Sequence, residues 1–103
     1  KYNLPIDRIS KYCNVINGKR VTTNTPSKIT NTIHILGPCG SFCPAVSDSY
    51  TIESYLQRIL NNEIPNNSIS VNNCGVPGSD TVNDFEYMIN QKYKLINLVF
   101  ELS

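Results

Sequence analysis

The sequence predicts an α/β domain built on a parallel sheet. A short, mostly apolar run at residues 32–36 and a second strand-like stretch at residues 69–74 each end at a turn that contains glycine and proline, and a third strand-like stretch spans residues 95–100. Amphipathic helical patterns separate the three runs. Strands that alternate with helices and are joined by short connections are typical of right-handed crossovers and parallel pairing.

An N-terminal β-hairpin is predicted ahead of this core. The turn residues Asn17-Gly18-Lys19 lie between two strand-like stretches, 12–16 and 20–23. Asn-Gly favours a type I′ turn because both residues tolerate positive φ. Pro26 then ends the second strand, since proline has no N–H to donate to a ladder.

The first core helix is predicted to begin after Thr51, a natural N-cap, with Glu53 favourably placed in its first turn. Its apolar residues recur at helical spacing and should pack on the sheet: Ile52, Tyr55, Leu56, Ile59 and Leu60. The tyrosines on or near the helices are expected in the core or at helix–sheet contacts: Tyr50, Tyr55, Tyr87 and Tyr93.

A second helix is predicted to begin at residues 79–81, where Thr81-x-x-Asp84 is similar to a capping box. Together the elements predict part of a three-layer, flavodoxin-like parallel sheet, with about three core strands and two helices. We expect residues 1–28 to form the hairpin extension and residues 29–103 to form this α/β domain.

Composition excludes several classes of function. The chain has 103 residues, of which 40% are hydrophobic and 17% charged, as expected of one globular domain. A net charge of +1 gives no basic excess for binding nucleic acid. No apolar run reaches the roughly 20 residues of a membrane helix. Of the four cysteines, the pair Cys39-x-x-x-Cys43 lacks a second pair or a nearby histidine. We therefore expect no metal, no cofactor, reduced thiols and a cytoplasmic location.

Candidate chemistry lies beyond the carboxyl ends of the predicted strands, where open α/β sheets bind ligands. Gly37-Pro38-Cys39-Gly40-Ser41 follows the first strand, residues 74–79 follow the second, and residues 101–103 follow the third. Neither glycine-rich turn has the Gly-Lys-Ser/Thr ending of a Walker loop or the three glycines of a dinucleotide fingerprint.

The turn motifs resemble those of the SGNH (GDSL-type) hydrolase superfamily. Residues 37–41 are similar to its Gly-Asp-Ser-x-Ser block at Gly37 and Ser41, with Pro38 in place of Asp and Cys39 at the nucleophile position. Residues 73–78 match its Asn-x-Gly-x-x-Gly block. The resemblance covers residues 29–103 and implies an esterase or acyl hydrolase that acts on a small-molecule ester.

The resemblance also implies roles for single residues. Cys39, or Ser41 in its place, would be the nucleophile, the backbone N–H of Gly78 would bind the oxyanion, and Asp48 would lie in the substrate loop. The family's third block and its Asp-x-x-His base have no match up to Ser103, so the chain is expected to be an inactive N-terminal portion of the enzyme.

Two alternatives remain open. A non-catalytic interaction domain derived from the same scaffold would explain Pro38 and Cys39. A flavodoxin-like or receiver domain is a weaker fit, because a receiver needs an acidic pair after the first strand and a phosphoacceptor Asp after the third, and residues 37–39 and 101–103 supply neither. His34, in the middle of the first strand, is expected to be a half-buried structural histidine. Self-association, with a dimer as the expected species, is predicted through residues 95–100 and an uncovered sheet face.

Overall fold

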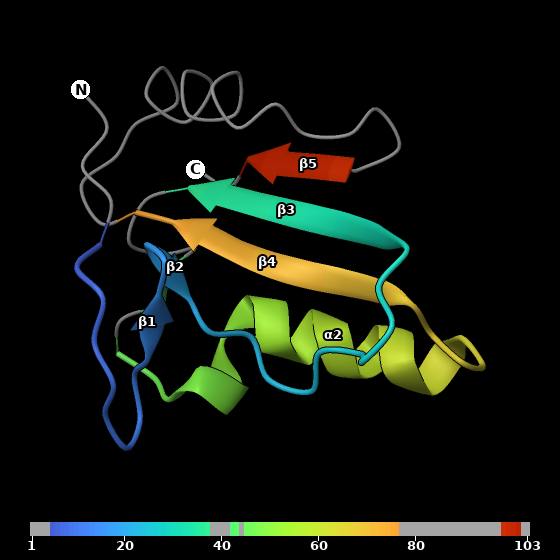
Figure 1. Ribbon diagram of the computed structural model, residues 1–103, viewed down its shortest axis with the longest axis horizontal. Helices are drawn as coiled ribbons and strands as arrows, with labels where there is room; N and C mark the ends of the chain where they lie inside the picture. Colours follow the sequence, from blue (N-terminus) through green and yellow to red (C-terminus); the bar gives the residue numbers. More distant parts are fainter. Residues whose placement is uncertain (1–4, 38–41, 44, 77–97, 102–103) are drawn as a thin grey trace.

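The computed structural model describes residues 5–37, 42–43, 45–76 and 98–101, which form a mixed five-stranded sheet in the order β1-β2-β4-β3-β5. The central strand β3 (Asn31–Gly37) pairs in parallel with β4 (Ile69–Gly75) and with β5 (Leu98–Glu101) (Figure 1). The predicted parallel pairing of the three core strands is therefore confirmed. The predicted second helix, and residues 95–97 of the third strand, lie outside the described residues.

The predicted hairpin is present and extends the sheet. Its strands β1 (Val15–Ile16) and β2 (Lys19–Arg20) are antiparallel, and the turn residues Asn17 and Gly18 have φ of 53° and 75°, as a type I′ turn requires. The carboxylate of Asp7 accepts hydrogen bonds from both turn N–H groups, at 2.9 and 2.8 Å. Strand β2 then adds antiparallel to β4 through the pair Arg20 and Asn73, so the hairpin is part of the sheet.

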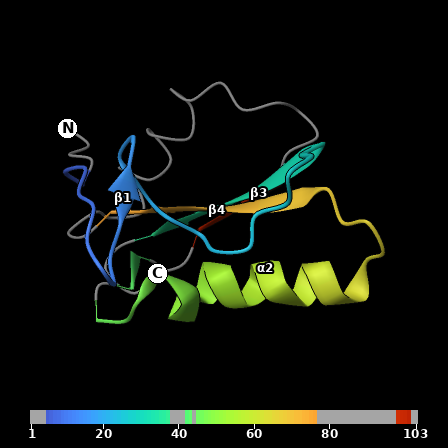
Figure 2. The same ribbon diagram turned by 60° about the horizontal axis from the view of Figure 1, so that its bottom comes forward.

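One helix, α2 (Ile52–Glu63), forms a layer on one face of the sheet (Figure 2). It follows the short 3-10 helix η1 (Asp48–Tyr50) and begins where predicted, because the Thr51 hydroxyl accepts a hydrogen bond from the Ser54 N–H at 3.1 Å. At the other end, the N–H of Ile64 bonds the carbonyl of Leu60 at 3.0 Å.

The predicted packing of this helix is wrong. Ile52, Tyr55 and Ile59 are 50%, 51% and 56% exposed, whereas the side chains turned toward the sheet are polar. Leu56 and Leu60 are only partly covered. Tyr50, expected in the core, is likewise 60% exposed. The helix therefore presents its apolar side outward.

Complementary hydrogen bonds explain the inverted helix. Gln57, which is fully buried, accepts a hydrogen bond from the Val71 N–H at 2.8 Å and donates one to the Ile69 carbonyl at 2.9 Å. Glu53, also fully buried, accepts a hydrogen bond from the Asn73 side chain at 3.1 Å. These bonds pair buried polar groups of the helix with polar groups of β4, and a buried polar group without a partner is costly.

The two faces of the sheet follow from these contacts. Asn73 faces α2, so strand alternation turns the adjacent Asn72 to the opposite face, together with its register partner His34. Leu36 and Cys74 lie on that opposite face and are 1% and 2% exposed.

Candidate functional site

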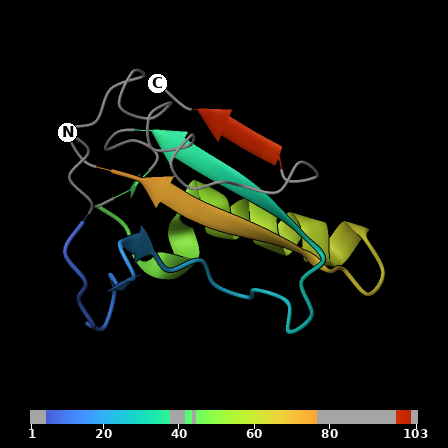
Figure 3. The same cartoon turned by 45° about the horizontal axis from the view of Figure 1, so that its top comes forward.

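The carboxyl ends of the three parallel strands lie at one end of the sheet (Figure 3). There β3 and β4 finish in register at Gly37 and Gly75, and the Val76 N–H donates to the Gly37 carbonyl at 2.8 Å. Gly37 has a φ of 154°, a value that a residue with a β-carbon disfavours. The last described residues before the predicted nucleophile and oxyanion donor, Gly37 and Val76, therefore lie side by side.

Three of the four predicted site residues lie outside the described residues, namely Cys39, Ser41 and Gly78. The fourth, Asp48, is well described, and so is residue Cys43, which follows the nucleophile segment. What the structure shows at this edge is therefore how the loop after β3 is anchored.

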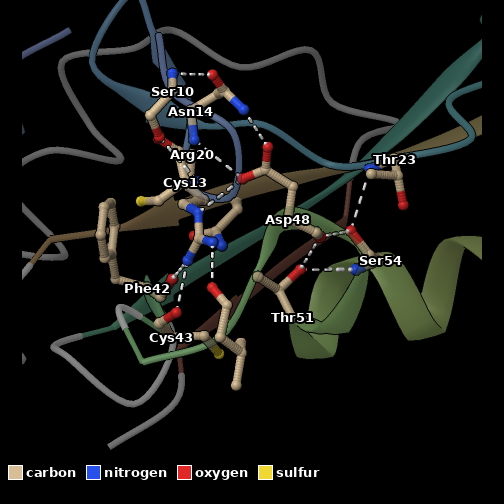
Figure 4. A network of polar contacts seen from close by, with 12 residues as sticks. Ser10, Cys13, Asn14, Arg20, Thr23, Phe42, Cys43, Asp48, Thr51 and Ser54 are labelled. Carbon is tan, nitrogen blue, oxygen red and sulfur yellow. Dashed lines mark hydrogen bonds and ion pairs between the residues drawn. The ribbon is translucent and has the colours of Figure 1, made fainter. Parts of the chain in front are cut away.

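A buried arginine anchors that loop (Figure 4). Arg20 is 2% exposed, and its guanidinium donates to the carbonyls of Phe42, Cys43 and Val46 and, through Nε, to Asp48 Oδ1 at 3.1 Å. Its carbon Cζ also lies 5.5 Å from the centroid of the Phe42 ring. We call these residues, together with Asn14, the Arg20 cluster. Through it, one side chain of the hairpin binds the loop after β3 at four points.

Asp48 is the acidic partner in the cluster. Its carboxylate accepts hydrogen bonds from the backbone N–H of Asn14 at 3.0 Å and from the Asn14 side chain at 2.6 Å, besides the Arg20 ion pair. Its backbone carbonyl accepts the Ser54 hydroxyl at 2.6 Å (Figure 4). Asp48 therefore joins the hairpin, the loop and the start of α2.

Anchoring explains an unusual backbone at Cys43. Its φ of 57° lies in the left-handed region, which costs a residue with a β-carbon roughly 1–3 kcal/mol. Because Arg20 binds the carbonyls of both Phe42 and Cys43, the surrounding contacts hold this conformation.

A surface depression of about 370 Å³ lies beside Asp48. Hydroxyl, carboxylate, amine and aromatic groups line it, from Lys11, Tyr12, Thr23, Ser47, Asp48 and Ser49. The Thr23 hydroxyl oxygen is buried and has no hydrogen-bond partner within the described structure. The depression is thus a hollow of mixed polar and apolar character, bordered by the predicted substrate-loop residue Asp48.

His34 does not reach the carboxyl edge. It lies three positions before Gly37 and is 5% exposed, more deeply buried than the half-buried position expected. Burial, and to a smaller extent the charge of Lys19, lowers its pKa from 6.5 to about 4. Asn72 Nδ2 lies 3.5 Å from its Nδ1. At neutral pH the ring is uncharged, and its position suits a structural group.

Sequence reasoning missed Arg20, although a signal was present. A two-residue turn fixes the hairpin register, which pairs Val15 with Arg20 and so places both on one face. Since Val15 is an expected core residue and is 1% exposed, the register alone indicates that Arg20 points inward.

The described part of the chain contains neither a metal-binding cluster nor a membrane-spanning helix. No group of three or more His, Cys, Asp or Glu side chains within residues 5–37, 42–43, 45–76 and 98–101 could hold a metal ion. Over the same described residues, no helix has the length and apolar character needed to cross a bilayer.

Fold and site define an α/β domain whose parallel core ends at an arginine-anchored loop. No model of a known family matches the chain, and comparison with curated proteins and with solved structures gives no match either.

Proposed function

We propose that this domain is the N-terminal portion of an SGNH-type acyl-ester hydrolase in which Cys39 is the nucleophile. The observation that supports it is the hydrogen bond from the Val76 N–H to the Gly37 carbonyl, at 2.8 Å. Cys39 follows Gly37 by two residues and Gly78 follows Val76 by two, and each residue extends the chain by about 3.5 Å at most. Nucleophile and oxyanion donor are thereby tethered to one point of the sheet edge.

The proposed chemistry is acyl transfer through a thioester. The Cys39 thiolate attacks the ester carbonyl carbon, the bond to the alcohol oxygen breaks, and the alcohol leaves with a proton. Water then hydrolyses the thioester, which releases the acid and restores the thiol. The Gly78 N–H stabilises the negative oxygen that forms in each step. Ser41 is the alternative nucleophile, and the base is assigned to an Asp-x-x-His block outside these 103 residues.

In this proposal the Arg20 cluster serves the site by fixing the loop that follows the nucleophile segment. Asp48 keeps its place in the substrate loop, since it borders the depression while its carboxylate holds Asn14 and Arg20. A small ester with a polar acyl or alcohol portion fits such a hollow, because its hydroxyl groups can both donate and accept hydrogen bonds.

Acylation of the chain itself tests the proposal. At about pH 9 a thiol ionises without a base, so p-nitrophenyl acetate should release one p-nitrophenolate per chain and leave one acetyl group, located by mass spectrometry at Cys39. Cys39→Ala should abolish the burst, whereas Ser41→Ala should preserve it. Cys13, a half-buried free thiol, is the internal reference.

Oxyanion stabilisation should make Cys39 react at least about 10-fold faster than Cys13, since one such donor contributes about 10²–10³ in enzymes. Equal rates at the two thiols would contradict the proposal. They would favour the second candidate, a non-catalytic interaction domain on the same scaffold, which is supported by the exposed apolar side of α2.

We also propose the partial three-layer, flavodoxin-like arrangement, with a second helix over residues 79–89 on the sheet face opposite α2. The burial of Leu36 and Cys74 on that face supports it. Helical carbon chemical shifts over residues 79–89 would test it, and extended shifts there would contradict it. The free thiol of Cys13 supports the further proposal of a reducing, cytoplasmic location.

A further inference from the structure

The outward side of α2 is the least expected surface of the molecule. Ile52, Tyr55 and Ile59 lie along it, Tyr50 precedes it, and each of the four side chains is at least half exposed. We call these four residues the α2 outer surface. Figure 2 shows the helix as a layer with the sheet on one side only, so this surface points away from the sheet. Single exposed apolar residues are ordinary, but a contiguous stripe marks an interaction site.

The residue types and their order also suit an interface. The rings of Tyr50 and Tyr55 lie 6.4 Å apart at 43°, and the guanidinium of Arg58 lies 4.6 Å from the Tyr55 ring centroid. Arg58 is itself held, because it donates to the Ser49 carbonyl at 2.7 Å. Tyrosine and arginine dominate binding energy at interfaces, and side chains held in advance lose less entropy on binding.

We propose that the α2 outer surface binds a second copy of this chain, with the two α2 helices antiparallel about a two-fold axis. A two-fold contact requires a self-complementary surface. Ile52, Tyr55 and Ile59 recur at intervals of three and four residues, which is the spacing of a helix–helix seam.

The charge at the end of α2 favours a second copy of the chain over an unrelated apolar protein as the partner of this surface. Glu63 lies in the last turn of α2, where the helix dipole disfavours an acid, and that turn carries no basic residue. In an antiparallel pair, the end of one helix lies beside the start of the other. Glu63 of one copy then lies near Ile52 at the positive N-terminal end of its partner's helix, where a carboxylate is favourable.

The size of the surface sets the expected affinity. A helix of 12 residues is about 18 Å long. One such face is smaller than the roughly 800 Å² per partner of a standard stable interface. We therefore expect a dimer with a micromolar dissociation constant. The proposal does not depend on acyl transfer, and it gives the interaction-domain alternative a specific partner.

Sedimentation equilibrium of the 103-residue chain, from about 1 to about 200 µM, brackets this affinity. The wild-type chain should pass from monomer to dimer. Ile59→Glu should weaken the dimer at least about 30-fold. The two-fold symmetry places the substitution in the interface twice, and each copy loses about half of the free energy that full burial of an isoleucine side chain contributes. Ile16→Glu is the matched control, since Ile16 is 50% exposed but lies on β1. It should leave the dimer unchanged.

Glu63→Lys separates dimerisation from folding. It improves the charge at the end of its own helix, so the monomer should melt at the same or a higher temperature, yet the dimer should weaken about 3- to 30-fold. A chain that stays monomeric throughout would overturn the proposal, and so would equal effects of Ile59→Glu and Ile16→Glu. A dimer insensitive to both Ile59→Glu and Glu63→Lys would point to residues 95–100 instead. None of these outcomes affects acylation of Cys39.

Discussion

Arg20→Lys is the sharpest test of how the loop after β3 is held. The substitution keeps the positive charge but replaces a planar fork of five N–H donors with one ammonium group. In the wild-type chain, the guanidinium makes four hydrogen bonds, which reach Asp48 and three backbone carbonyls in different directions. One ammonium group cannot reach the carboxylate and all three carbonyls together.

The expected magnitude follows from those four bonds. A hydrogen bond to a charged group contributes about 1.5–3 kcal/mol net, so the loss of two lowers the free energy of unfolding by about 3–6 kcal/mol. That is a large share of the roughly 5–15 kcal/mol of a typical domain. Arg20→Met should cost at least as much, because it leaves the Asp48 carboxylate, 13% exposed, without its counter-charge.

Urea unfolding followed by circular dichroism measures the effect, with Arg8→Lys, at an exposed arginine, as the control. The control should stay within about 0.5 kcal/mol of the wild type. Arg20→Met combined with Asp48→Asn should cost less than the sum of the two single changes, since the two charges disappear together. A change of less than about 1 kcal/mol for Arg20→Lys would refute the role given to the guanidinium.

Three further predictions concern single groups. Below pH 6.5 His34 is protonated in the unfolded chain but stays neutral in the folded chain, where its pKa is about 4. The free energy of unfolding should therefore fall by about 2 kcal/mol between pH 7 and pH 5. His34→Gln should remove most of that dependence, and an unchanged profile in urea titrations would contradict it. Gln57→Leu leaves the Val71 N–H without an acceptor, while the Ile69 carbonyl keeps its hydrogen bond from the Asn67 side chain, so the variant should cost about 1–3 kcal/mol despite greater apolarity; a more stable variant would contradict this role of Gln57. Gly18→Ala, at a φ of 75°, should lower the melting temperature by several degrees, about 1 kcal/mol, while a gain in stability would argue against the type I′ turn.

Local signals accounted for the elements that the sequence predicted well. Asn17-Gly18 specifies its turn through its own backbone preferences, and Thr51 caps α2 through its own hydroxyl. The strands ended near their glycines because the chain must turn there. Each of these features depends on residues adjacent in sequence, which a single sequence displays.

The orientation of α2 depends on polar contacts with β4, a strand that is distant in sequence from the start of the helix. The apolar stripe predicted an inward face, but Asn73 in β4 also faces the helix and requires a polar partner, which Glu53 supplies. The Gln57 side chain forms hydrogen bonds with backbone groups of β4. Every residue other than proline has these backbone groups, so the sequence does not reveal them as partners. The polar pair Asn72-Asn73 within the predicted second core strand was a sequence signal for this arrangement.

The candidate site also contains residues that a local motif predicts and residues whose role depends on tertiary contacts. Cys39, Ser41 and Gly78 were predicted from motif resemblance, which needs no knowledge of packing. Arg20 was not predicted, because three of its four acceptors are main-chain carbonyls that any residue could supply. Asp48 was predicted as a substrate-loop residue, but its ion pair with Arg20 was not predicted, because Arg20 lies 28 positions earlier in the chain.

Because of that separation, the hairpin can form during synthesis before its packing partners have left the ribosome. At roughly 5–20 residues per second, Arg20 leaves the ribosome about 1–6 s before Asp48 does, whereas the Asn17-Gly18 turn can close within about 1–10 µs. The nascent hairpin therefore spends seconds with Val15 and Arg20 in water, and it docks only when β4 arrives. Late docking should give hairpin substitutions low φ-values, so Arg20→Lys should act mainly by accelerating unfolding.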